Sequence, residues 1–425
     1  MDGAPLFKAP PDLAAGLRVF LARAGAPHRL LIAVSGGSDS MALMRLAARL
    51  AENGEAAVSV ATVDHGLRAA SRLEAATVGA AARDLGLDHA ILAWAGEKPK
   101  TGLQTAARRA RYLLLVRHAH EIGAEAIMTA HTADDQAETV AMRLARRSGP
   151  RGLSAMREDA WIAAGASTPI RLLRPLLGVR RQALRDFLTA EGAGYFDDPS
   201  NDDPSFERVR VRRRLAGEGV ASGAHGALID TARRMRIDAA LLEAAENERF
   251  AALGGAFDCW GGARLSSAPG ASDAGLIARL IASISGGDYP PNETKAAKAL
   301  ARARSGRHAT LGGVMLVPER GRLLLTREPA AVFGREGVGP LNDAEIAPGA
   351  TILWDNRHVI ANRFDAAAAV SPLDAGEARS LGFDEAAIAG PVLRIAGDIV
   401  AIPGESDAFT PLAAERFYQR VNRFY

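Results

Sequence analysis

The sequence has too few cysteines for the protein classes that depend on them. Cys259 is the one cysteine among 425 residues. It cannot close an internal disulfide, and it cannot supply the Cys-x-x-Cys pair of a zinc or redox site. No apolar run approaches the roughly 18 to 20 residues that a membrane span needs, and residues 1–17 lack the basic start and apolar block of a secretory signal. These absences predict a cytoplasmic protein with no membrane segment.

The chain carries only a small excess of positive charge, with a formal net charge of +3. The basic residues are mostly arginines, whose planar guanidinium groups suit phosphate. The densest group of them is Arg208, Arg210, Arg212, Arg213 and Arg214. A local basic patch can serve solubility or RNA binding. From the residues alone, a solvated helix face and a contact with RNA remain equally open.

The first part of the chain alternates short apolar runs with longer helical patterns. This alternation predicts parallel strands joined by helices, and therefore an α/β fold with a doubly wound parallel sheet. In such sheets, ligands bind at the carboxyl ends of the strands. The pattern predicts strands over 30–34, 57–63, 90–94 and 126–129, and helices over 40–52, 73–85, 103–122 and 133–147.

The character of the sequence changes near residue 217. A long amphipathic pattern over 228–250 predicts a helix, and shorter helices and a hairpin near 312–325 follow. After residue 329, short strand signals alternate with turns. We therefore expect three domains: a catalytic α/β domain over 1–216, a mainly helical domain over 217–329 that ends in the hairpin, and a small α+β domain over 330–425.

The polar loop after the first predicted strand has the composition of a phosphate site. It reads Ser35, Gly36, Gly37, Ser38, Asp39 and Ser40, and it opens a predicted helix. The two glycines allow a tight turn, and backbone N–H groups at a helix N-terminus attract phosphate. The loop lacks the lysine of a Walker motif. Asp39 is placed to hold Mg²⁺ against the phosphates, or else to cap the helix.

Residues 34–40 resemble the PP-loop of the ATP pyrophosphatase family, whose members split ATP to AMP and pyrophosphate and adenylate a substrate. Within that family, the later motifs are similar to those of the tRNA(Ile)-lysidine synthetases. The resemblance covers about residues 28–216. Its motifs are DHGLR at 64–68, ARRARY at 107–112, TAHTADDQAET at 129–139, RPLL at 174–177 and DPSN at 198–201.

The resemblance implies an ATP-dependent ligase that adenylates the wobble cytidine of an isoleucine tRNA at carbon 2. The ε-amine of L-lysine then displaces AMP and forms lysidine. The partners that it implies are ATP with Mg²⁺, tRNA(Ile) and L-lysine, and the domains after residue 216 are expected to read the tRNA.

The resemblance also assigns roles to individual residues. It implies that His65, Thr129 and His131 contact ATP beside the PP-loop. It places Asp39, Arg111, Asp135 and Glu138 in lysine binding or catalysis. Because Asp135 and Glu138 are three residues apart on a predicted helix, they share one face. The tRNA phosphates are expected to meet Arg146, Arg151, Arg208, Arg210 and Arg212.

Other interpretations of these residues remain open. Asp134 is a candidate helix cap, and His65 an ordinary residue at a strand end. Arg108, Arg109 and Arg111 are candidates for a solvated helix face. Val209 stands where the family often has asparagine in an Arg-Asn-x-x-Arg segment. One rival function is a different PP-loop tRNA enzyme, such as a thiolase, against which the single Cys259 counts. The other is a non-catalytic module that binds ATP or RNA, against which the acidic residues near the loop count.

Overall fold

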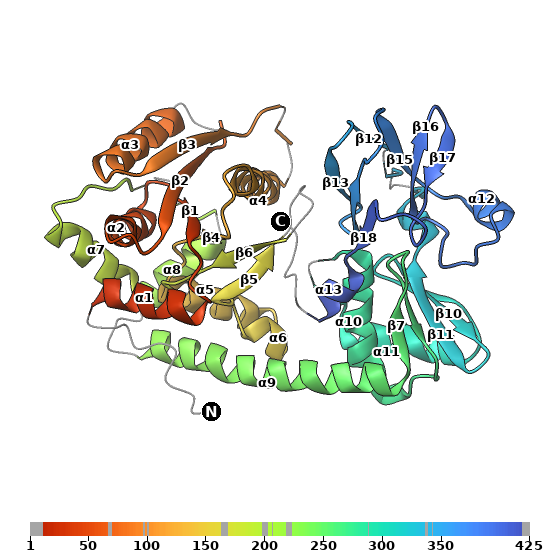
Figure 1. The fold of residues 1–425 in the computed structure, drawn as a ribbon. Helices are drawn as coiled ribbons and strands as arrows, with labels where there is room; N and C mark the ends of the chain where they lie inside the picture. Colours follow the sequence, from red (N-terminus) through yellow and green to blue (C-terminus); the bar gives the residue numbers. More distant parts are fainter. Residues whose placement is uncertain are drawn as a thin grey trace. The chain divides into compact units, whose positions relative to one another are not determined.

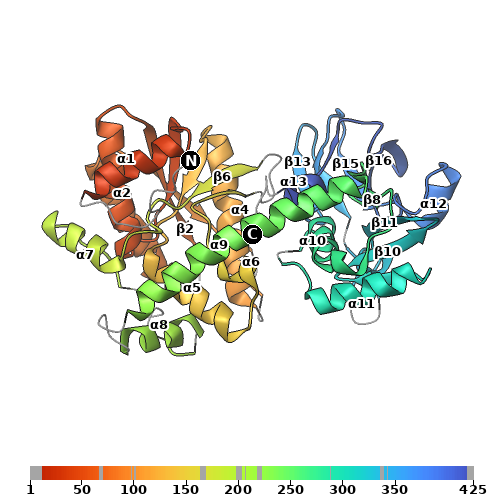
Figure 2. The same ribbon diagram turned by 90° about the horizontal axis from the view of Figure 1, so that it is seen from below.

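The computed structural model describes residues 12–66, 70–96, 98–99, 102–162, 169–197, 203–205, 207–217, 223–287, 289–335, 339–341 and 343–418. The chain separates into two compact units. The first comprises residues up to 160 and 170–242, and the second comprises 243–424 with the short stretch 161–169. The two units are connected through helix α9 (Ala224–Ala252) (Figure 2).

The first unit contains the predicted parallel sheet (Figure 1). Within the described residues, its six strands lie in the order β3-β2-β1-β4-β6-β5, and the pairs β3-β2, β2-β1, β1-β4 and β4-β6 are parallel. The predicted fold class is confirmed. The strands are β1 (Arg29–Ala33), β2 (Ala57–Asp64), β3 (Asp88–Ala93), β4 (Ala126–Met128), β5 (Asp159–Ile162) and β6 (Ile170–Leu173).

The central strand β1 is apolar on both faces because helices cover both sides of the sheet. Leu30 and Ile32 pack in one core with residues of α1, α2, α3 and α7, while Leu31 between them is equally buried. Helix α4 lies across the sheet from α2 in Figure 1. The helices of this unit are α1 (Leu13–Arg23), α2 (Ser38–Glu52), α3 (Ala70–Asp84), α4 (Leu103–Glu121), α5 (Ala133–Ala145), α6 (Pro150–Leu153), α7 (Arg181–Ala190) and α8 (Glu207–Gly217).

Helix α9 is longer than the pattern over 228–250 predicted, with 29 residues. Its first half belongs to the first unit. There Ala232 packs against Val140 and Leu153, and Arg236 donates hydrogen bonds to the backbone oxygens of Ser154 and Met156 at 3.2 and 2.7 Å. These contacts attach the start of α9 to α5 and to the segment after α6.

The second unit begins with a sheet packed on two helices. The described strands of this sheet follow the order β7-β8-β11-β10-β9, and β10 and β11 form the predicted hairpin, with Val314 opposite Arg327. Leu280 and Ile284 of α10 pack against this sheet. The elements are β7 (Gly255–Phe257), β8 (Ala263–Leu265), α10 (Ala274–Ser285), α11 (Glu293–Arg304), β9 (Ala309–Leu311), β10 (Val314–Glu319) and β11 (Arg322–Arg327).

The remainder of the second unit consists of two small antiparallel sheets, as the strand signals after residue 329 predicted. Their orders are β12-β15-β16-β17 and β13-β14-β18. The division into three domains stays a prediction. The elements are β12 (Ala344–Ile346), β13 (Thr351–Trp354), β14 (His358–Ala361), β15 (Ala368–Pro372), α12 (Ala375–Ser380), β16 (Pro391–Ile395), β17 (Asp398–Ala401), β18 (Phe409–Pro411) and α13 (Ala413–Phe417). No helix in the described ranges is both long and apolar enough to cross a membrane.

Candidate functional site

The predicted phosphate loop joins β1 to the N-terminus of α2. Gly36 has a φ of +90°, and a Cβ atom there would lie 3.1 Å from Cδ2 of Phe196. Gly37 is the N-cap residue of α2, and no side chain within the described residues caps the helix at this position. Inside the loop, the Ser35 N–H donates to Ser40 Oγ at 3.2 Å, and that hydroxyl donates to the Gly37 oxygen at 3.0 Å. The loop therefore presents uncapped N–H groups, as an anion site requires.

Asp39 lies in the first turn of α2, so it is not the cap of this helix. Its Oδ2 accepts a hydrogen bond from Nε of Arg181 at 2.9 Å, and its Oδ1 accepts one from the Ser38 hydroxyl at 3.2 Å. Burial raises the pKa of Asp39, although Arg181 opposes that shift. A cation from the start of α7 thus offsets part of the effect of burial on this carboxylate, and the net shift of its pKa remains upward.

The start of α5 holds two further carboxylates that the sequence singled out. Thr132 is the N-cap, and Asp135 completes its capping box by accepting from the Thr132 N–H at 2.8 Å. The interpretation of Asp134 as the cap is wrong, because Asp134 instead accepts hydrogen bonds from Arg180 at 3.0 to 3.2 Å. Asp135 therefore caps the helix with Oδ2, and its Oδ1 is available to side chains from other helices.

The other carboxylate oxygen of Asp135, Oδ1, takes no part in the capping box. It accepts hydrogen bonds from Nη2 of Arg181 and from Nη2 of Arg208, each at 3.1 Å. Burial opposes ionisation of Asp135, but the cations Arg208 and Arg181 outweigh it, so its pKa lies below the usual value. The group is therefore ionised at neutral pH.

Glu138 lies one turn further along α5 and is only 1% exposed. Its oxygens accept from Nε of Arg208 at 2.6 Å and from Nε of Arg212 at 2.7 Å, and Nη1 of Arg181 is 3.7 Å away. The three carboxylates are thus joined by three guanidinium groups. We call this set the carboxylate–arginine cluster: Asp39, Asp135, Glu138, Arg181, Arg208 and Arg212.

The arginines expected on an RNA surface have different surroundings. Arg208 and Arg212 face the carboxylates of α5, as described above. Arg210 donates to the backbone oxygens of Pro204 and Ser205 at 2.8 Å each. Arg146 forms an ion pair with Glu207 and remains 61% exposed, and Arg151 lies half-buried in α6. Sequence proximity alone did not show that two members of the basic run turn inward.

The residues expected beside the nucleotide lie at the carboxyl ends of β2 and β4. The hydroxyl of Thr129 is 3.0 Å from Nδ1 of His131. His65 packs edge-on against Trp94, and its Nδ1 is buried without a hydrogen-bond partner in the described ranges. Burial lowers the pKa of His65, and Arg111 adds to that effect. His65 is therefore neutral near pH 7 and carries one unpaired polar atom.

Arg111 is not part of a solvated helix face, because its Nε is buried and, among the described residues, has no hydrogen-bond partner. The neighbouring Arg109 is exposed, as that interpretation expected. Burial, and next Arg174, hold the pKa of His131 well below its usual value. Positive charge from Arg111 and Arg174 therefore gathers around a neutral histidine, which favours an anionic ligand.

Sequence reasoning missed Arg181 and the role of Arg174. Arg181 bridges Asp39 and Asp135, and Arg174 is 4% exposed with one hydrogen bond from Nη1 to the Arg157 oxygen at 2.8 Å. The signal was present in the motif RPLL at 174–177 and the arginine pair that follows it. The DPSN motif at 198–201 and residues 67–68 of DHGLR lie outside the described residues.

A metal ion at this site would have to use few protein ligands. Among the described residues, no three His, Cys, Asp or Glu side chains are grouped closely enough to hold a metal. Mg²⁺ in nucleotide sites commonly takes one or two carboxylates together with phosphate oxygens and water. Asp39, with Asp135 close enough to raise its pKa, fits that pattern.

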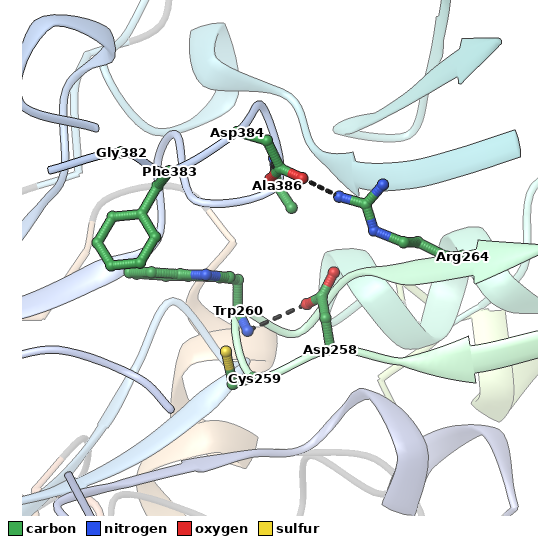
Figure 3. Close-up of a pocket in the computed structure, with 8 residues that line it drawn as sticks. All are labelled: Asp258, Cys259, Trp260, Arg264, Gly382, Phe383, Asp384 and Ala386. Atoms are coloured by element: carbon green, nitrogen blue, oxygen red, sulfur yellow. Dashed lines mark hydrogen bonds and ion pairs between the residues drawn. The ribbon is translucent and has the colours of Figure 1, made fainter. Parts of the chain in front are cut away.

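A separate hollow of about 350 Å³ lies in the second unit. Figure 3 shows Asp258 below the hollow, with Trp260 and Phe383 on one side and the ion pair between Arg264 and Asp384 on the other. One oxygen of Asp258 accepts from the N–H groups of Trp260 and Gly262 at 3.0 and 2.7 Å. None of the residues predicted for catalysis or nucleotide binding lines this hollow.

Comparisons with known proteins agree with the site. The model of the PP-loop domain family matches residues 13–218. A tRNA(Ile)-lysidine synthase of Ruegeria pomeroyi is 39% identical over 79% of this chain and 77% of its own length. Those of Methylobacterium nodulans and Mesorhizobium japonicum are 41% and 36% identical, over 72% and 93% of this chain and 92% and 86% of theirs. The resemblance inferred from the motifs is confirmed: the chain belongs to the tRNA(Ile)-lysidine synthase family.

Proposed function

We propose that this protein converts the wobble cytidine of an isoleucine tRNA to lysidine. It uses ATP and L-lysine and releases AMP and pyrophosphate. The observation that carries the proposal is the carboxylate–arginine cluster beside the PP-loop, where acidic groups suited to a cationic substrate lie close to the loop proposed for phosphates. A cytoplasmic location is part of the same proposal, since tRNA and ATP are available there.

The first step is adenylation. The cytosine O2 attacks the α-phosphorus of ATP, the bond to the β-phosphate breaks, and pyrophosphate leaves. The uncapped N–H groups at the start of α2 hold the leaving phosphates. Asp39 would hold Mg²⁺, which would supply charge neutralisation to the phosphates. The side chains near β2 and β4, His65, Thr129 and His131, contact the rest of the nucleotide.

The second step is attack by lysine. The neutral ε-amine adds to carbon 2 of the cytosine, the C–O bond breaks, and the former O2 leaves as part of AMP. Asp135 and Glu138 bind the lysine as an ammonium, because buried carboxylates stabilise a cation. One of them accepts a proton as the amine becomes the nucleophile. Arg111, whose Nε has no hydrogen-bond partner among the described residues, stabilises negative charge on the AMP phosphate.

The tRNA must place an unstacked cytosine at this site, since carbon 2 is not accessible within a base stack. Arg146 is exposed and remains the clearest candidate among the predicted arginines for a phosphate contact. Arg151 and Arg210 are further candidates. Arg208 and Arg212 already pair with Glu138, so an RNA phosphate would compete with that carboxylate for them.

The experiment is incorporation of radiolabelled lysine into tRNA. Purified protein, ATP and Mg²⁺ are incubated with an isoleucine tRNA transcript that carries a wobble cytidine, and pyrophosphate release is followed in parallel. The matched control is the same transcript with a wobble uridine, which should accept no lysine. Incorporation into both transcripts, or sulfur transfer in place of lysine, would sink the proposal.

A further inference from the structure

Arg181 occupies the centre of the carboxylate–arginine cluster. Its guanidinium reaches Asp39 at 2.9 Å, Asp135 at 3.1 Å and Glu138 at 3.7 Å. In the sequence, Asp39 lies 142 positions and Asp135 lies 46 positions from Arg181. One side chain therefore joins the acid beside the phosphate loop to the acids of α5.

The charges of the cluster are balanced without any ligand. Three carboxylates meet three guanidinium groups, and each carboxylate has at least one arginine as an ion-pair partner. The proposed ligands of the same acids are both cationic: Mg²⁺ at Asp39 and the lysine ammonium at Asp135 and Glu138. Bringing them in beside three arginines would place like charges at close range, which is unfavourable in a half-buried site.

Departure of Arg181 would still leave Glu138 and Asp135 with arginine partners. Glu138 keeps Arg208 and Arg212 at 2.6 and 2.7 Å, and Asp135 keeps Arg208 at 3.1 Å. For Asp39, by contrast, Arg181 is the cation that the described residues supply. Departure of Arg181 thus frees Asp39 most, and it frees Asp135 in part.

The backbone of Arg181 is fixed independently of its side chain. Its N–H donates to Oδ2 of Asp134 at 2.8 Å, and Leu184 and Leu188 of the same helix are buried in the core with α2. The side chain is 19% exposed. The guanidinium can therefore move by rotation of its side chain while α7 stays in place.

We propose that Arg181 is the counter-ion of Asp39 and Asp135 in the ligand-free site. Its guanidinium must move away from these acids when Mg²⁺ and the lysine ammonium bind. Arg181 lowers the affinity for both cations and keeps the three acids together until they arrive. The lysine part of this inference rests on the proposed function, while the metal part depends only on Asp39 and Asp135.

The test compares Arg181→Gln with the unchanged protein in the absence of ATP and tRNA. Mn²⁺, which also prefers carboxylate ligands, is titrated and its free fraction is measured by electron paramagnetic resonance; lysine binding is measured by calorimetry. Removal of a competing cation should tighten Mn²⁺ binding about fivefold or more, the lower end of ordinary coupling between sites. Lysine binding should tighten by a smaller factor, because Arg208 still holds Asp135.

The matched control is Arg185→Gln, one turn along α7. Arg185 pairs with Asp197 at 3.5 Å, outside the cluster, so its replacement should leave both affinities unchanged. Arg181→Lys retains the charge, but a compact ammonium cannot span three carboxylates. Its Mn²⁺ affinity should fall between those of the unchanged protein and Arg181→Gln, which also provides a test if the glutamine variant does not fold.

Weaker or unchanged Mn²⁺ binding in both Arg181 variants would overturn the inference and make Arg181 a residue that only positions the acids. The lysine incorporation assay on the unchanged protein separates the two proposals. If that protein forms no lysidine, the proposed function fails, and the Mn²⁺ titration still decides the role of Arg181. If it forms lysidine and the Mn²⁺ affinity does not rise, only the role of Arg181 fails.

Discussion

Replacing Glu138 with glutamine should destabilise the first unit, because the carboxylate compensates two arginines in a nearly closed site. Glu138 is 1% exposed, and its two oxygens accept from Arg208 and Arg212 at 2.6 and 2.7 Å. Removing one partner of a fully buried ion pair costs about 3–5 kcal/mol. Arg208 and Arg212 are 39% and 32% exposed, and water compensates part of the loss. We therefore expect a loss of about 2–3 kcal/mol.

The assay is thermal unfolding followed by circular dichroism, with urea unfolding as the second measure. For a unit of roughly 200 residues, such a loss lowers Tm by about 5–10 °C. The control is Glu207→Gln: Glu207 pairs with Arg146, which is 61% exposed, so this loss should stay below about 1 kcal/mol. The double variant Glu138→Gln/Arg212→Gln should regain part of the stability, since one uncompensated cation is removed with the acid. Equal small losses in both single variants would refute the idea that Glu138 is a buried counter-ion.

Three further predictions follow from the same site and from a buried histidine. Asp39→Asn should abolish pyrophosphate release while a gel-shift assay still detects tRNA binding; loss of tRNA binding as well would indicate that Asp39 is structural. Gly36→Ala should weaken ATP binding at least tenfold in calorimetry, because Gly36 has a φ of +90° and a Cβ would meet Phe196 at 3.1 Å; unchanged affinity would show that the turn is not required. His358 is fully buried, and burial followed by Arg357 holds its pKa well below the usual value. Below about pH 6.5, His358 binds a proton in the unfolded chain but stays neutral in the folded chain. The free energy of unfolding should therefore fall as pH drops through about 6.5. His358→Phe should reduce that fall in urea unfolding at pH 7.5 and 5.5, whereas an identical fall would assign it to other groups.

Much of the first unit could be predicted from the sequence because its signals are local. An apolar run such as 30–34, followed by a glycine-rich turn and a helix, defines its own backbone within about ten residues. The order of strands and helices then restricts the sheet topology, since parallel crossovers follow a strong handedness rule. The glycine pair of the PP-loop was informative for the same reason: Gly36 requires a positive φ that the turn itself imposes.

The motif residues at the strand ends were also accessible from the sequence. His65, Thr129 and Asp135 follow or lie close to strands whose carboxyl ends meet at one edge of the sheet. What each side chain contacts was not accessible. Asp134, the cap expected from the sequence, pairs instead with Arg180, which lies 46 residues further along the chain, and Thr132 caps α5.

The sequence by itself determined the parallel-sheet fold, the phosphate loop and the family. Only the tertiary structure decided that Arg208 and Arg212 turn toward Glu138, and that Arg181 joins Asp39 to Asp135 across 142 and 46 residues. The physical reason is that a charge cluster in a sequence states which groups are present, while their partners depend on which helices the core brings together. Here the packing of α7 on α2 and of α8 on α5 makes that choice.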